Sequence, residues 1–305
     1  MSIYNSQQAK QLETQITEFV KELAQRTDNV KASEFFKNYL EIISKIPHYS
    51  YHNQILILLQ ASAIGINPTR VMGYMQWKNF NRNVLSGEKG ISILIPAFRY
   101  FDEESHKLEY DNETKSYYCP VCSRHFEMSE IKKAVIGFKT AHVFDISQTD
   151  GEPLQEIDIS VNGENYGEFI EILKEFCSEH GIQVAFEKLS KEGLYGYSQG
   201  GRIVINNAEN INSQVAVMVH EIAHELLHKE KNDLTRQQKE IQAEGVAYVV
   251  CKHFGLEAKS FNYLALYDAD YKAIMENLSV VSSTSGNLIQ YIKGKMAEKM
   301  IVAEM

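Results

Sequence analysis

Two histidines stand four residues apart in His220-Glu221-Ile222-Ala223-His224. On a helix this spacing places both imidazoles on one face about one turn apart, so both can reach one tetrahedral zinc ion. Glu221 faces the same cavity, where it can take a proton from the attacking water and pass it to the leaving amine. The pattern therefore predicts a zinc-dependent peptidase site of the HExxH type, with Glu221 as its catalytic base.

The sequence around the motif predicts the helix that this chemistry needs. An Asn/Ser start signal precedes it, the apolar residues Val215, Val219 and Ile222 recur at helical spacing, and no Gly or Pro interrupts residues 213–228. In a purely structural helix, His220 and His224 would lie beside this apolar stripe without an obvious partner, which is costly for buried polar groups. A metal ion would supply that partner.

A catalytic zinc usually takes three protein ligands and leaves one position for water. The next predicted helix, residues 236–253, carries Glu240 and Glu244 four residues apart, and apolar residues surround them. We expect Glu240 to be the third ligand, as in gluzincin-like sites, and Glu244 to bond a ligating histidine. The alternatives are a solvated acidic face, and His228 as third ligand, although three histidines on one straight helix splay apart.

A turn and a strand precede the metal helix at residues 195–206. The edge of such a strand can hold an extended peptide by main-chain pairing. Tyr195 or Tyr197 would then stabilise the oxyanion of the reaction, with ordinary packing as the alternative role.

The distribution of charge separates two halves. The chain carries a net charge of −9, yet residues 1–148 contain 17 Lys and Arg against 16 Asp and Glu, and residues 149–305 contain 14 against 24. Residues 66–100 contain five Lys and Arg residues but a single acid, Glu88, and aromatic residues lie between the cations in the sequence. Cations that follow a backbone, with aromatic rings for base stacking, suit single-stranded nucleic acid.

The predicted elements indicate an α+β fold in two domains. Helices are expected at 5–27, 31–45 and 52–63, and short strands follow up to residue 144. A polar, acidic stretch with Gly151 and Pro153 marks the boundary. We expect a domain at 1–148, a linker at 149–163 and a second domain at 164–305, which ends in a helical tail.

A Cys-x-x-Cys pair, Cys119 and Cys122, lies in a polar insertion at about 100–132, which we expect to form a hairpin. With His125 three residues further on, the pair resembles half of a zinc knuckle, but a second pair of ligands is missing. Reduced thiols at a hairpin tip are one interpretation, and a second zinc site is the other. The N-terminus lacks a signal-peptide layout and no apolar run is long enough to span a membrane, so a cytoplasmic protein is expected.

Several longer motifs resemble the N-terminal domain of the ArdC-type antirestriction proteins. They are Ser50-Tyr51-His52-Asn53-Gln54-Ile55-Leu56, Val71-Met72-Gly73-Tyr74-Met75-Gln76-Trp77, Gly87-Glu88-Lys89-Gly90-Ile91 and Val143-Phe144-Asp145-Ile146-Ser147-Gln148-Thr149. The second half resembles the zincin-like peptidase domain of the same proteins, which is related to the ImmA/IrrE metallopeptidases.

The resemblance implies a single-stranded-DNA-binding domain followed by a zinc metallopeptidase domain. It implies a protein of conjugative mobile genetic elements that protects incoming DNA, with His220, His224 and Glu240 as zinc ligands. The residues proposed for DNA contacts are Asn53, Arg70, Trp77, Lys78, Arg82 and Lys89. The Cys-x-x-Cys insertion and the tail after Tyr271 fall outside the resemblance.

Two other functions fit the same residues. The protein is either a DNA-binding antirestriction factor whose metal site is structural, or an ImmA-like peptidase that cleaves a repressor. The sequence does not name the protein or peptide substrate.

Overall fold

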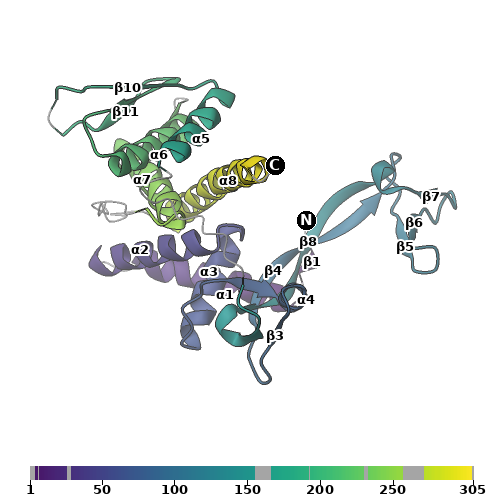
Figure 1. Cartoon of the computed structure of the whole chain (residues 1–305). Helices are drawn as coiled ribbons and strands as arrows, with labels where there is room; N and C mark the ends of the chain where they lie inside the picture. Colours follow the sequence, from purple (N-terminus) through teal and green to yellow (C-terminus); the bar gives the residue numbers. More distant parts are fainter. Residues whose placement is uncertain are drawn as a thin grey trace.

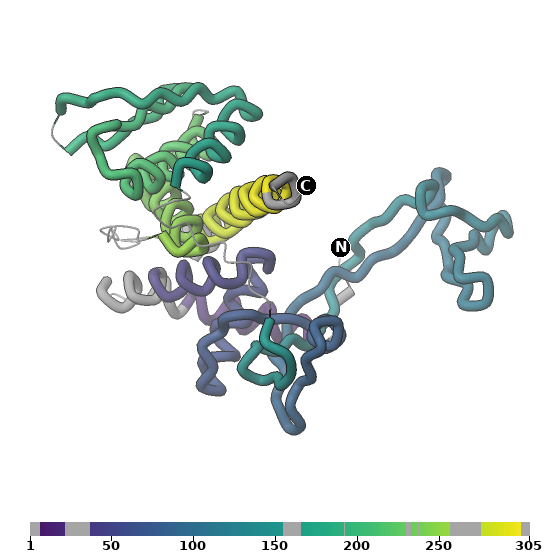
Figure 2. The backbone as a smooth tube through the Cα atoms, in the orientation of Figure 1, coloured from purple at the N-terminus to yellow at the C-terminus, as the bar shows by residue number. Residues whose placement is uncertain are grey.

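The computed structural model shows a body of packed helices from which a long two-stranded ribbon projects (Figure 1). The same path is followed by the backbone tube of Figure 2, from purple at the N-terminus to yellow at the C-terminus. Helices and strands occur in both halves, which confirms the predicted α+β class. The structure describes residues 4–5, 7–25, 29–154, 166–191, 193–229, 233–256 and 271–303.

Three helices form where apolar residues recur at helical spacing in the N-terminal segments. Pro47 separates the second helix from the third, which begins directly after the extended Ser50. All three confirm the expected elements, with bounds α1 Gln7–Gln25, α2 Asn29–Lys45 and α3 Tyr51–Ala63.

A long strand, β8, organises the N-terminal sheet. It pairs antiparallel with β4 from Ile91↔Val143 to Phe101↔Lys132, antiparallel with β2 and parallel with β1. The two short runs expected near residues 134–144 are thus one strand. The bounds are β1 Tyr4–Asn5, β2 Val71–Gly73, β4 Ile91–Phe101 and β8 Lys132–Asp145.

A small unit made of α4, β3 and β9 adjoins this sheet. β3 pairs antiparallel with β9, although β9 lies at the start of the segment expected to be the linker. Gly151 in β9 lies close to β3, because a Cβ there would come within 2.4 Å of the carbonyl oxygen of Asn81. Residues 155–163 of the expected linker lie outside the described residues. The bounds are α4 Tyr74–Asn79, β3 Arg82–Val84 and β9 Thr149–Gly151.

The Cys-x-x-Cys insertion lies at the far end of the β4–β8 ribbon (Figure 1). We call residues 102–131 the tip. Instead of one hairpin, the tip forms a three-stranded antiparallel sheet in the order β5-β6-β7, followed by a short 3-10 helix. Its buried apolar residues are Leu108, Cys119 and Phe126. The bounds are β5 Glu109–Asp111, β6 Ser116–Tyr118 and β7 His125–Phe126.

In the second half, a helix and three strands precede the two helices expected around the metal site. β12 lies in the middle of a three-stranded sheet, parallel to β10 and antiparallel to β11. A helix of 33 residues, α8, ends the described chain. The bounds are α5 Tyr166–Glu179, β10 Gln183–Glu187, β11 Gly196–Ser198, β12 Arg202–Asn206, α6 Ile211–His228, α7 Arg236–His253 and α8 Tyr271–Ala303.

The two halves share one hydrophobic core. Leu40 and Leu56 of the first half belong to the same buried cluster as Met218 and Val250 of the second. Hydrogen bonds also cross between them, since the Ser282 hydroxyl on α8 donates to Gln54 Oε1 at 2.8 Å. The division at 148 and 164 stays a prediction, and the structure adds that the proposed domains pack tightly on each other.

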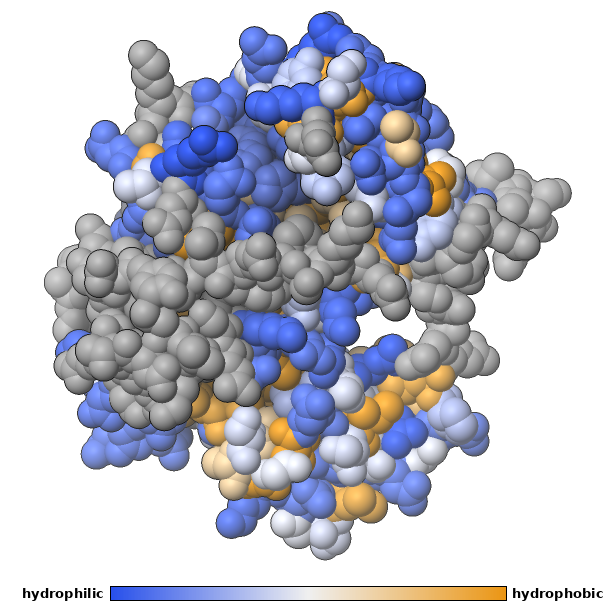
Figure 3. Space-filling model, turned by 90° about the vertical axis from the view of Figure 1, so that its left-hand side faces the viewer, coloured by the Kyte–Doolittle hydropathy of each residue, from blue (hydrophilic) through white to orange (hydrophobic). Residues whose placement is uncertain are grey.

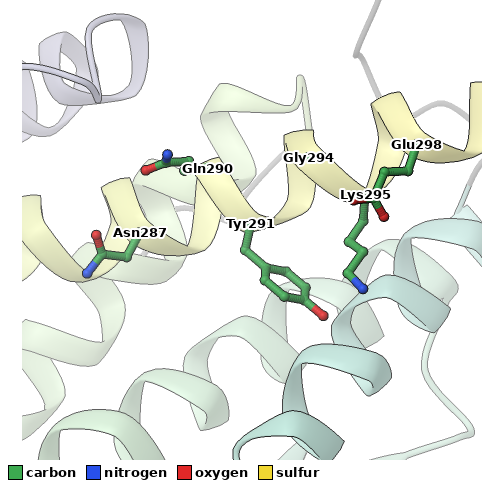
Figure 4. Close-up of a pocket in the computed structure, with 6 residues that line it drawn as sticks. All are labelled: Asn287, Gln290, Tyr291, Gly294, Lys295 and Glu298. Atoms are coloured by element: carbon green, nitrogen blue, oxygen red, sulfur yellow. The ribbon is translucent and has the colours of Figure 1, made fainter. Parts of the chain in front are cut away.

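Helix α8 is fixed to α5 by side chains that point toward it (Figure 4). The Tyr291 ring packs edge-on against Phe176 with centroids 5.0 Å apart, and Lys295 Nζ lies 2.5 Å from Glu175 Oε1. Burial raises the pKa of the Tyr291 phenol to about 12. The shallow pocket drawn in Figure 4 follows α8 and is lined by Asn287, Gln290, Tyr291, Gly294, Lys295 and Glu298.

The molecular surface differs between the upper and lower parts of the face in Figure 3. Hydrophilic residues predominate in the upper part and hydrophobic residues gather mainly in the lower part. Exposed large apolar side chains of the first half include Tyr74, Met75 and Phe80. Within the described ranges, no helix has the length and apolar character that crossing a membrane would require.

Candidate metal centre

The predicted metal helix is α6. Its N-terminus is capped by Asn210, whose side chain accepts a hydrogen bond from the Ser213 N–H at 2.9 Å. Val215, Val219 and Ile222 are fully buried and hold the helix against the core. The adjacent helix α7 begins at a Thr235 cap and packs along α6. The His-x-x-x-His face of α6 is thereby turned toward α7.

The structure brings His220, His224 and Glu240 together. The two histidine Nε2 atoms are 3.0 Å apart, and Glu240 Oε2 lies 3.5 Å from His220 Nε2 and 3.6 Å from His224 Nε2. All three donor atoms lie within 4.8 Å of one another, so one ion can contact all of them. Two imidazoles and one carboxylate are a donor set that suits a catalytic zinc or similar divalent ion.

His228 does not belong to this group of donors. Its Nδ1 lies 2.9 Å from His224 Nδ1, and its Nε2 lies 3.0 Å from Gln242 Oε1. The Gln242 amide in turn donates to Asn277 Oδ1 on α8 at 2.7 Å. This chain of contacts orients the His224 ring through the nitrogen that faces away from Glu240.

Electrostatics favour the charged forms of Glu240 and His220, which attract each other. Hydrogen bonds from His220 and His224 hold the pKa of Glu240 well below its usual range. Burial alone would lower the pKa of His220, but the hydrogen bond to Glu240 and the charges of Glu221, Glu240 and Glu244 raise it above its ordinary value. A cation between these groups would replace the proton that the histidines share with the carboxylate.

The two remaining carboxyl groups near the site are buried or half-buried. Glu221 is 8% exposed, and burial raises its pKa, while the neighbouring imidazoles act in the opposite direction. Burial likewise raises the pKa of Glu244. A raised pKa brings the Glu221 carboxylate nearer to the range in which a general base works at neutral pH. The hydrogen bond expected from Glu244 to a histidine stays a prediction.

Strand β11 lies beside the metal helix at the edge of its sheet. A Cβ at Gly196 would lie 2.6 Å from Val217 Cγ1, so β11 and α6 are in close contact. Glu225 fixes the following turn, because it accepts hydrogen bonds from the Ser198 hydroxyl at 2.6 Å and from the Gly201 N–H at 2.7 Å. The sequence interpretation missed Glu225, although an acid directly after the second histidine on a buried helix was a visible signal. Tyr195 is 46% exposed at the start of this edge.

The six residues proposed for DNA contacts do not form one surface. Asn53 is buried, donates to the Leu94 carbonyl and accepts from the Leu94 N–H, both at 2.8 Å. Trp77 is fully buried and its indole N–H donates to the Phe144 carbonyl at 3.0 Å. Neither side chain presents a face to a nucleic acid in this structure, because both hold α3 and α4 to the sheet.

The four cations of this group have different surroundings. The Arg82 guanidinium donates to the carbonyls of Thr149, Gly151 and Glu152 and so fixes β9 to β3. Arg70 is half-buried, and its backbone N–H donates to the Asp145 carboxylate at 3.1 Å. Lys78 and Lys89 are exposed, and Lys78 Nζ lies 5.0 Å from the centroid of the exposed Tyr74 ring. The exposed cations of the set are therefore Lys78 and Lys89.

The two cysteines of the tip are placed differently. Cys119 is fully buried and Cys122 is exposed, and both are free thiols. The Cys119 sulfur lies in a group with Asp102 and His106 whose donor atoms are all within 4.8 Å of one another. The sequence interpretation had paired Cys119 with Cys122 alone and had missed Asp102 and His106.

Family models match both halves of the chain. Residues 6–144 match the N-terminal domain of the anti-restriction factor ArdC. Residues 177–276 match the IrrE N-terminal-like domain, a peptidase family model that contains α6 and α7 with His220, His224 and Glu240. A curated relative, the uncharacterised protein pXO2-81 of Bacillus anthracis, is 26% identical over 93% of this chain, which spans about half (53%) of that relative's length.

Two crystal structures of the antirestriction protein ArdC of plasmid R388 are similar in outline. The metal-free form has 18% identity and a TM-score of 0.45 over 81% of this chain and 86% of that chain. The Mn(II)-bound form has 18% identity and a TM-score of 0.42 over 83% and 97%. The assignment itself rests on the two family models, which together match most of the sequence. The chain thus belongs to the ArdC type of proteins, with an ArdC N-terminal domain followed by an IrrE N-terminal-like domain.

Proposed function

We propose that the protein is a metal-dependent peptidase that also binds single-stranded DNA and acts in antirestriction on a mobile genetic element. The observation that carries the peptidase proposal is the convergence of His220, His224 and Glu240 within 4.8 Å, with Glu221 buried beside them. Three protein ligands and one open position are the arrangement of catalytic rather than structural zinc sites. Zinc is our choice of ion on the grounds of this donor set.

The residues of the site would divide the work of peptide hydrolysis. His220, His224 and Glu240 would hold the ion, which when bound polarises the scissile carbonyl and makes water a stronger nucleophile. Glu221 would take the proton of the attacking water and deliver it to the leaving amine. Among the described strands, β11 pairs with β12 alone, and its other edge would hold the substrate extended beside α6.

The DNA-binding part of the proposal rests on the first half of the chain. The exposed cations Lys78 and Lys89 lie in a segment with the exposed aromatic residues Tyr74 and Phe80. Such a surface combines attraction for phosphates with rings on which bases stack. The match to the N-terminal domain of an anti-restriction factor supports the same role. Binding of DNA would localise the peptidase or shield the strand.

Glu221→Gln tests the peptidase proposal. The amide keeps the shape of the side chain but cannot accept the proton, so we expect unchanged zinc content and a loss of about 100-fold or more in hydrolysis rate. The assay is mass-spectrometric analysis of a random peptide mixture incubated with zinc-loaded protein. Glu209→Gln, a matched change outside the metal centre, should cleave like the wild type.

The same experiment separates this proposal from its two alternatives, a DNA-binding factor with a structural metal site and a peptidase that cleaves one repressor. If the zinc-loaded wild type cuts no peptide in the mixture and no repressor protein encoded beside its gene, the enzyme proposal fails and a structural metal site remains. If it cuts only that repressor, the protein is a regulator of the ImmA kind. Cleavage that persists in Glu221→Gln would show that another residue is the base.

A further inference from the structure

Two tight turns in the tip have similar backbone hydrogen bonds. In the first, the Ser105 N–H donates to the Asp102 carbonyl and the Asp102 N–H to the His106 carbonyl, both at 3.1 Å. In the second, the Ser123 N–H donates to the Cys119 carbonyl at 2.8 Å, and the Cys119 N–H to the carbonyl of residue 124 at 2.9 Å. Each turn contains a serine with positive φ, 69° at Ser105 and 58° at Ser123. Each loop is thus closed by a pair of backbone hydrogen bonds, and the second loop is one residue longer than the first.

The turns bring three different donor types together. Asp102 Oδ2 lies 3.0 Å from His106 Nδ1, and the Cys119 sulfur is within 4.8 Å of a donor atom of each. Asp102 is 4% exposed and Cys119 is fully buried. A buried carboxylate, an imidazole and a thiol in mutual reach are a donor set for a divalent cation of the zinc class.

The tip needs such a stabilising element because its core is very small. Its buried apolar residues are only Leu108, Cys119 and Phe126, and its strands are two or three residues long. The β4–β8 ribbon holds it away from the main core (Figure 1). Sheets of this size are not stable alone in water, and small units of this kind usually depend on a disulfide or a metal ion. Both cysteines of the tip are free thiols.

We propose that the tip is a structural metal site for a divalent cation of the zinc class, held by Asp102, His106, Cys119 and Cys122. The first three already form the group described above. Cys122 stands outside that group, but it lies three residues after Cys119 on the same turn and is exposed. The proposal requires its thiolate to turn toward the ion when the ion binds. Four ligands complete the tetrahedral shell of a structural zinc site. The site is independent of the peptidase proposal, because it shares no residue with it.

Cobalt(II) binding to the full-length chain tests the proposal. The variant His220→Ala with His224→Ala removes the donors of the metal centre on α6, so any ion left is at the tip. We expect one equivalent of cobalt and a thiolate-to-cobalt charge-transfer absorption. Cys119→Ser in this background should lose both, whereas Cys177→Ser, a matched change of a buried cysteine on α5, should keep both. Absence of the absorption, or its survival in Cys119→Ser, would overturn the proposal.

Two further measurements cover local misfolding and the fourth ligand. In the unaltered zinc-loaded chain, a chelator should speed amide hydrogen exchange in residues 102–126 more than in β12; equal exchange before and after chelation would refute a structural role. Cys122→Ser leaves the buried core intact and should weaken zinc binding at the tip at least tenfold. An unchanged affinity would remove Cys122 from the ligand set and contradict the four-ligand site.

Discussion

At the scale of single residues, the orientation of the proposed ligand His224 depends on groups that lie outside the metal centre. Its Nδ1 contacts His228, which is held by Gln242, which is held in turn by Asn277 on α8. Such outer partners fix the ring orientation and the tautomer of a ligating histidine. The affinity of the proposed centre would therefore depend partly on α8, which begins at Tyr271, well after the last proposed ligand, Glu240.

Gln242→Leu would break this chain of contacts without touching a ligand. We expect a loss of about 10–100-fold in zinc affinity, because the His224 ring loses its orientation. Competition with a chromogenic chelator at constant pH measures the effect. Gln290→Leu, the same change at an exposed position on α8, should leave the affinity unchanged; an equal loss in both variants would mean that α8 itself had been disturbed.

The residues of the site differ in how far the sequence could predict them. The spacing of His220 and His224 defines a helical face, so both were predictable, and Glu240 followed from the donor count of a catalytic zinc. Asp102 and His106 could not be predicted as partners of Cys119, because only the strand register of the tip brings the two turns together. Trp77 and Asn53 were read as DNA contacts because sequence patterns reveal a residue's type but not its burial.

At the scale of elements, helices α2 and α7 meet at His253. Its Nδ1–H donates to the Ser44 carbonyl at 2.6 Å, while its Nε2 is buried without a hydrogen-bond partner in the described structure. Burial lowers the pKa of His253 below its ordinary value of 6.5; Lys293 and His48 act in the same direction, and the bond to Ser44 opposes them. This contact joins the two halves of the chain.

We expect this joint to weaken in mild acid. In the unfolded chain His253 takes up a proton near its ordinary pKa of 6.5, whereas in the folded chain it does so only at lower pH. The contribution of neutral His253 to the free energy of unfolding is therefore fully present above pH 6.5 and is lost as the pH falls below it. His253→Gln keeps a donor for Ser44 and should flatten this pH dependence between about pH 5 and 7. Urea unfolding at several pH values measures it, and an unaltered slope would show that other groups dominate.

The order of elements was largely predictable, since helices and strands follow the periodicity of apolar residues. Strand β11 was missed as a strand of its own, because its Gly196-Tyr197-Ser198 sequence resembles a turn, and its pairing with β12 depends on contacts distant in sequence. Strand β9 was read as linker for the same reason. Short strands with polar residues carry little periodic signal.

At the scale of the whole molecule, charge is divided between the halves while the core is shared. The second half carries most of the negative charge and the proposed peptidase, so nucleic acid should approach the first half. Because Leu40 and Leu56 lie in the same core as Met218 and Val250, the two halves pack as one body despite their different charge.

Lys78→Ala with Lys89→Ala tests where single-stranded DNA binds. Each cation that contacts a phosphate contributes about 0.7 to the slope of log affinity against log salt for single strands, so the double variant should lower that slope by about 1.4 and weaken binding at low salt. Fluorescence anisotropy with a labelled oligonucleotide measures both. Lys174→Ala with Lys191→Ala, on the second half, is the control, and an effect of equal size there would move the DNA site.

The end of the β4–β8 ribbon is a point at which sequence can be inserted or removed. Phe101 and Lys132 are register partners, so the chain leaves the ribbon and returns to it at one point. A two-residue hairpin turn could close β4 onto β8 there without any shift in the rest of the sheet. The position is thus a natural insertion site, at which modules of different length can be gained, lost or exchanged while the proposed metal centre and the shared core stay as they are.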